Sequence, residues 1–115
     1  TMFGISVPDD SRGCLQDIHW SFGGIGYFPT YTLGNLYAAQ FMSAAKSELG
    51  SDALAEDFRR GEFRLLRDWL IRKIHRHGQR YRAADLCRRT TGASLSPEPF
   101  MHYLNEKCGK LYGIC

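Results

Sequence analysis

The 115-residue sequence contains no run of 18 apolar residues, and this absence excludes a transmembrane helix within it. Its opening stretch, TMFGISVPDDSRG, also lacks the basic start and the apolar block of a secretory signal. We therefore expect a cytoplasmic protein without a membrane partner, unless a targeting signal lies outside this chain.

Metal-ligand patterns are equally scarce. The four cysteines form no CxxC pair, and the four histidines form no HExxH motif. We expect free thiols, because nothing else in the sequence suggests an oxidising compartment. His102 and Glu106 stand four residues apart on a predicted helix, and we interpret them as an exposed polar pair. We therefore predict no metal site within this chain.

The alternating runs that are typical of β-strands are also missing, and helical periodicity takes their place. From Tyr31 onward, apolar residues fall on one face of a helix that Gly50 would end. The residues of this face are Leu33, Leu36, Tyr37, Phe41 and Ala44. Further helices are predicted over 51–58, over 62–78, over 82–91 with Gly92 behind it, and from Pro97 onward. The sequence predicts an all-α fold of four to five helices, preceded by an irregular segment rich in glycine and aromatic residues.

The predicted helices carry signals for their ends and for their buried faces. Ser51 or Asp52 would cap the second helix, and Ser96 would cap the last helix, with Pro97 at its first position. Two buried stripes are expected: Phe63, Leu66, Leu70 and Ile74, widened by Trp69, and then Phe100, Tyr103, Leu104 and Leu111.

Charge is distributed unevenly along the chain, whose formal net charge is +3. Residues 59–89 hold eleven of the fifteen lysines and arginines. Such a region can bind phosphates. However, Arg64, Arg67, Arg72 and Arg76 lie away from the apolar stripe or at its edge, as on the solvated side of an amphipathic helix. Aromatic residues do not interleave with them as in single-strand binders, so we expect no nucleic-acid partner.

The stretch HWSFGGIGYFPTY, residues 19–31, holds the candidate catalytic residues His19, Tyr27 and Tyr31. Imidazole and phenol can both donate hydrogen bonds to a developing oxyanion. The glycines of this stretch would let the backbone approach a ligand or act as hinges, and they are Gly23, Gly24 and Gly26. The alternative is that the aromatic side chains cover a hydrophobic core from a loop.

Gln16 and Asp17 directly precede this stretch. Asp17 could orient His19, which is a common role of a carboxylate beside a functional histidine. The alternative, a solvated acid in a turn, is equally compatible with the spacing.

Three segments of the chain resemble one known family: GCLQDIHW at 13–20, GYFPTYTLGNLYAAQ at 26–40, and TGASLSPEPFMHYLNEKCGKLYG at 91–113. They are similar to the C-terminal part of the thermostable, Taq-type zinc carboxypeptidases, whose motif is G-x-x-Q-D-x-H-W. Every fixed position of the motif is matched, by Gly13, Gln16, Asp17, His19 and Trp20.

The resemblance implies a cytosolic, mostly helical and usually homodimeric enzyme that removes single C-terminal amino acids from peptides. Zinc or cobalt would be held by an HExxH helix and a later glutamate. His19 would donate a hydrogen bond to the substrate and the transition state, with Tyr31 the first choice for the oxyanion phenol and Tyr27 the second. Gln16 and Asp17 would shape the substrate site behind His19. Residues 23–26 would supply the glycines that allow the loop to close over the peptide.

The chain departs from the family by lacking HExxH, the metal-ligand glutamate and the arginine motif that receives the substrate carboxylate. We therefore expect a fragment-like single domain, with 1–30 as a substrate-loop segment and 31–115 as the helical part of a larger fold. It would bind a peptide substrate together with a missing N-terminal part, would be inactive alone, and would self-associate through uncovered faces. The competing hypotheses are a stand-alone helical module that binds a peptide or protein and, more weakly, an arginine-rich nucleic-acid binder.

Overall fold

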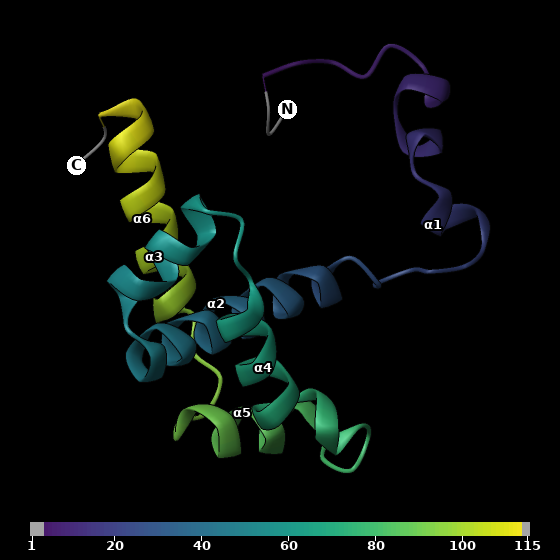
Figure 1. Cartoon of the computed structure of the whole chain (residues 1–115). Coiled ribbons are helices and arrows are strands. Elements are labelled where there is room, and N and C mark those ends of the chain that lie inside the picture. The colour runs from purple at the N-terminus through teal and green to yellow at the C-terminus, as the bar shows by residue number, and fades with distance from the viewer. Residues whose placement is uncertain (1–3, 114–115) are drawn as a thin grey trace. The chain divides into compact units, whose positions relative to one another are not determined.

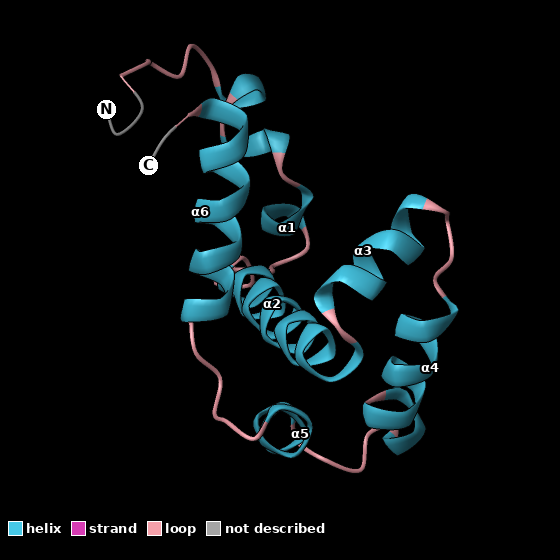
Figure 2. Ribbon diagram, turned by 60° about the vertical axis from the view of Figure 1, so that its left-hand side comes forward, coloured by secondary structure: helices cyan, strands magenta, loops and turns pink. Residues whose placement is uncertain are grey.

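The computed structural model describes residues 4–113, which form α-helices and short 3-10 turns and no strand (Figure 2). The predicted all-α fold is confirmed. The chain divides into two compact units, Thr1–Leu33 and Gly34–Cys115, which are described separately below. Among residues 4–113, no helix combines the length and the hydropathy that a membrane span requires.

The first unit contains the 3-10 turns Asp10–Arg12 and Cys14–Gln16 and the four-residue helix α1, Ile18–Ser21 (Figure 1). Helix α2, Pro29–Leu49, begins in this unit. Two expectations were wrong here, since residues 18–21 are helical and α2 starts two residues before Tyr31. Proline fits the first turn of a helix, because its missing N–H has no partner at that position anyway.

The second unit contains the rest of α2, then α3 (Ser51–Arg59), α4 (Arg64–Lys73), the 3-10 turn His75–His77, α5 (Ala83–Thr91) and α6 (Glu98–Tyr112). Gly92 ends α5 in the left-handed conformation, with φ of 78°, as its position in the sequence predicted. The helix predicted over 62–78 is shorter than expected, because Ile74 leaves helical geometry and only a 3-10 turn follows.

The cap predicted for the helix after Gly50 was wrong. Gly50 itself occupies the N-cap of α3, with φ of 91°, and neither Ser51 nor Asp52 caps the helix. One residue separates two helices here, and glycine adopts the required positive φ without strain. At α6, the helix begins at Glu98 rather than at Pro97, and the Ser96 hydroxyl accepts a hydrogen bond from the Glu98 N–H over 3.2 Å.

The core of the second unit takes one apolar side chain from each of four helices. Ala45, Leu54, Trp69 and Cys87 are each at most 1% exposed. The Trp69 indole N–H donates to a Glu48 carboxylate oxygen over 3.0 Å, and the Lys73 ammonium donates to the other oxygen over 2.8 Å. This carboxylate therefore ties α2 to α4 while satisfying the one polar atom of a buried tryptophan.

The Gln40 side chain forms a second set of buried hydrogen bonds between segments, and this set was not predicted. It lies on α2 and is 5% exposed. Its amide donates to the Thr91 hydroxyl over 3.1 Å and to the Ser94 carbonyl over 3.0 Å, and its oxygen accepts from the Ser96 N–H over 3.0 Å. One side chain thus fixes the segment between α5 and α6 against α2.

The buried stripe predicted for the last helix was wrong, since α6 has no buried residue. Tyr103 is 46% and Leu111 is 65% exposed, and Phe63 of the other predicted stripe is 59% exposed. The apolar spacing does mark a helix face, but no described residue covers that face fully.

Candidate functional site

The site lies within the first unit and begins at the N-cap of α1. Asp17 has extended backbone geometry, and its Oδ1 accepts from the His19 N–H over 3.3 Å. This is the usual way for an aspartate to satisfy a free N–H at the start of a helix. The Gln16 amide donates to the Ser11 carbonyl, so that side chain is bonded to the loop before it.

The imidazole of His19 stands between a carboxylate and a phenol. Its Nδ1 lies 2.7 Å from Asp17 Oδ1, and its Nε2 lies 3.1 Å from the Tyr31 hydroxyl. The side chains of His19 and Asp17 are 17% and 26% exposed. The Asp17 carboxylate therefore lies against the His19 imidazole and is only partly exposed, unlike a fully solvated acid in a turn.

Aromatic rings surround this imidazole. Tyr27 stacks on it, with ring centroids 5.4 Å apart and an angle of 21° between the planes. Tyr31 stands edge-on to Tyr27 at 5.3 Å, and Phe28 lies 4.9 Å from His19. Tyr27, Phe28 and Phe22 are 46–64% exposed, so these rings gather around the histidine and do not form a sealed core.

Three glycines shape the turn that returns the chain to His19. Gly23 and Gly26 have φ of 79° and 78°, which side-chain-bearing residues rarely adopt. The Gly24 N–H donates to the His19 carbonyl over 2.7 Å, and a Cβ at Gly24 would lie 3.2 Å from that oxygen. Absence of a side chain at Gly24 permits this close approach, so the glycines have a local conformational role whatever they contact in a complex.

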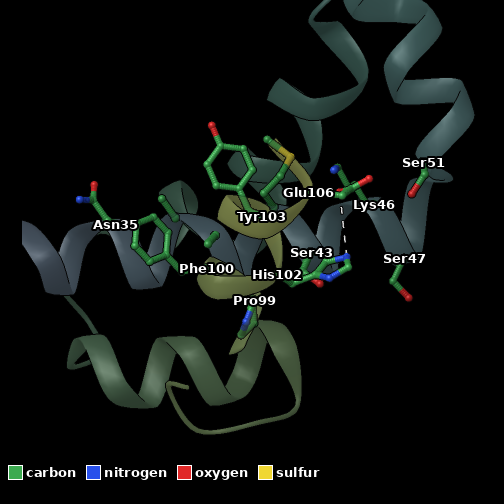
Figure 3. Close-up of a pocket in the computed structure, with 13 residues that line it drawn as sticks. Asn35, Ser43, Lys46, Ser47, Ser51, Pro99, Phe100, His102, Tyr103 and Glu106 are labelled. Atoms are coloured by element: carbon green, nitrogen blue, oxygen red, sulfur yellow. Dashed lines mark ion pairs between the residues drawn. The ribbon is translucent and has the colours of Figure 1, made fainter. Parts of the chain in front are cut away.

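A separate pocket of about 720 Å³ lies in the second unit between α2 and α6 (Figure 3). Phe100 and Tyr103 of α6 line it, together with Lys46 of α2. His102 and Glu106 also belong to its lining, and they form an exposed pair 4.0 Å apart. None of the predicted site residues lines this pocket, and sequence reasoning did not find it, because a pocket depends on the space between helices that periodicity does not show.

The comparison with known families decides where the chain belongs. A family model described as carboxypeptidase Taq (M32) metallopeptidase matches residues 1–108. The chain belongs to this family. The resemblance seen in the motif G-x-x-Q-D-x-H-W is thereby confirmed.

Individual members of the family agree with this assignment. Thermostable carboxypeptidase 1 of Thermus thermophilus is 49% identical over 110 residues, which are 96% of this chain and 21% of that protein. Carboxypeptidase 1 of Bacillus subtilis is 42% identical, over 95% of this chain and 21% of that protein. The crystal structure of the M32 carboxypeptidase from Deinococcus radiodurans superposes with a TM-score of 0.87 and 43% identity, over 96% of this chain and 22% of that one. The chain therefore spans about one fifth of the length of these relatives.

The family is one of metallopeptidases, but the described residues do not fit a metal. No group of three or more histidine, cysteine, aspartate or glutamate side chains in residues 4–113 could hold a metal ion. Asp17 and His19 form only a pair, and His19 Nε2 already faces the Tyr31 hydroxyl. The arrangement orients an imidazole and presents phenol hydroxyls, which are groups that donate and accept hydrogen bonds.

Proposed function

We propose that this chain is the substrate-binding part of a metal-dependent carboxypeptidase that releases single amino acids from the C-termini of peptides. The observation that carries the proposal is the cluster of His19, Tyr27 and Tyr31, which the family motif and the glycine turn bring within 6 Å of one another, measured between ring centroids. An oriented imidazole that holds phenol groups in place suits a peptide carbonyl on which negative charge develops, because a phenol hydroxyl can donate a hydrogen bond to that oxygen.

In this proposal the chain contributes hydrogen bonds and exclusion of water, while bond cleavage needs groups outside it. Asp17 holds the imidazole in place, and the aromatic side chains of Phe22 and Phe28 reduce the exposure of the site to water. Hydrogen bonds of this kind become stronger as charge accumulates on the carbonyl oxygen, and they therefore favour the transition state over the ground state. Movement about the turn at Gly23 and Gly26 would close the segment over the peptide.

The metal of the family would be held by the part of a carboxypeptidase that this chain does not include. We expect zinc or cobalt there, and a cytoplasmic homodimer as the working enzyme. The chain alone is accordingly expected to be inactive towards peptides. The Gln16 amide would support the segment from behind rather than touch the peptide.

A chimeric enzyme tests the proposal directly. The 110-residue segment of the Thermus thermophilus carboxypeptidase that aligns with this chain would be replaced by this chain, and release of the C-terminal amino acid from a blocked dipeptide would be measured. We expect the chimera to be active, this chain alone to be inactive, and His19→Ala to lower kcat about 10²- to 10³-fold with an unchanged melting temperature.

The matched control is His102→Ala, because His102 is an exposed histidine outside the cluster. It should leave kcat unchanged. A folded chimera that releases no amino acid would reject the proposal and would favour a stand-alone binding module. Activity that survives His19→Ala would reject the role assigned to the cluster.

A further inference from the structure

The structure assigns to Asp17 a role beyond orientation: it fixes the tautomer of His19. An ionised carboxylate can only accept hydrogen bonds, so the 2.7 Å contact places a hydrogen on Nδ1 of the imidazole. Asp17 Oδ1 also accepts from the His19 N–H, so the same oxygen receives two donors from one residue. In the neutral ring, Nε2 is then left without a hydrogen.

The tautomer decides the direction of the next hydrogen bond. A neutral Nε2 without a hydrogen can only accept, so across the 3.1 Å contact the Tyr31 hydroxyl donates to His19. Tyr31 has a single hydroxyl hydrogen, which this bond uses. The hydrogen bonds therefore run in one direction, from Tyr31 to His19 and from His19 to Asp17. Neither the neutral imidazole nor the Tyr31 phenol retains a free donor.

One phenol of the cluster, that of Tyr27, remains available as a hydrogen-bond donor. Tyr27 stacks on His19 and stands edge-on to Tyr31, and its side chain is 48% exposed. Its hydroxyl forms no hydrogen bond with the described residues. Tyr27, rather than Tyr31 or a neutral His19, is thus the group with a free hydrogen for a substrate oxygen. This last step rests on the proposed function, whereas the tautomer and the bond direction do not.

The tautomer is tested on the chain itself by NMR. With the histidines labelled with ¹⁵N, long-range ¹H–¹⁵N correlations distinguish a protonated ring nitrogen from an unprotonated one, and His19→Gln assigns the signals. In a sample whose shifts show a neutral ring, we expect the hydrogen of His19 on Nδ1. A neutral ring with its hydrogen on Nε2 would overturn the inference.

Two variants test the direction of these hydrogen bonds. Tyr31→Phe should leave the hydrogen of His19 on Nδ1. The ¹⁵N chemical shift of Nε2 should move to that of a nitrogen that accepts no hydrogen bond. An unmoved Nε2 shift would refute the donation from Tyr31 to His19. Asp17→Asn should weaken the preference for Nδ1–H, and Asp10→Asn, an exposed acid in the same unit, should not. If Asp17→Asn does not fold, the wild-type and Tyr31→Phe spectra still decide the question.

The role of Tyr27 is tested in the chimera. We expect Tyr27→Phe to lower kcat about 10²- to 10³-fold with little change in KM, and Tyr31→Phe to lower it much less. An equal or larger loss for Tyr31→Phe would overturn the assignment of Tyr27. A folded chimera without activity would reject the proposed function and would leave the NMR result for His19 standing.

Discussion

Replacement of Gln40 should destabilise the protein more than its polarity suggests. Its side chain makes three hydrogen bonds from a site that is 5% exposed. A buried hydrogen bond contributes about 0.5–1.5 kcal/mol net, and the Ser94 carbonyl belongs to an exposed residue that water can reach. We therefore expect Gln40→Met, which keeps the volume, to lower the free energy of unfolding by about 2 kcal/mol. Gln40→Ala also leaves a cavity and should cost about 4 kcal/mol.

Urea unfolding followed by circular dichroism measures this effect. With an m-value of about 2 kcal/mol/M, the midpoint of Gln40→Met should fall by about 1 M while m stays constant. Gln79→Ala removes an exposed glutamine and should change the free energy of unfolding by less than about 0.5 kcal/mol. If Gln40→Met unfolds within about 0.5 kcal/mol of the wild type, the three hydrogen bonds do not stabilise the packing as argued.

Three further results are expected. The hydrogen bond from Lys73 holds the pKa of Glu48 below its usual 4.5. The stability that the Glu48–Lys73 ion pair adds is therefore fully present above pH 4.5 and is lost as the pH falls through the lowered pKa. Glu48→Gln should flatten this part of the stability–pH curve and cost no more than about 1 kcal/mol at pH 7, because both side chains are partly exposed; an unchanged curve would contradict the argument. Gly24→Ala should crowd the carbonyl of His19 and move its ring ¹⁵N shifts, whereas Gly34→Ala, with open space around its Cβ, should not; shifts that stay in place would show that the turn tolerates a side chain. The exposed apolar residues of α4 and α6 should cause concentration-dependent self-association in sedimentation velocity, and a monomer at every concentration would refute that expectation.

Much of the fold followed from local signals. The 3.6-residue spacing of apolar side chains and the glycine after each helix located α2, α3 and α5 closely, because both signals act within a few residues. Gln40 could not be predicted, since a glutamine on a helix usually faces solvent and its partners lie more than 50 residues away. The exposure of α6 was missed because periodicity shows that a face is apolar and does not show what covers it.

The sequence could predict which residues lie near one another in the candidate site, but not the hydrogen bonds that they form. Asp17 and His19 are two residues apart, so their contact follows from local geometry. The choice between Tyr27 and Tyr31 depends on the turn between residues 22 and 27, whose path is set by positive φ angles at glycines. Sequence spacing cannot supply that path, and therefore it left the direction of the hydrogen bond to Tyr31 open.

The buried thiol of Cys87 gives the chain its own reporter of unfolding. Its side chain is 0% exposed, whereas Cys14 is exposed. A thiol reagent should therefore modify Cys14 faster than Cys87, which it reaches only when α5 separates from its neighbours. Mass spectrometry of the two sites over time would separate opening of the helical unit from events near the amino terminus, without a fluorescent label or an engineered residue.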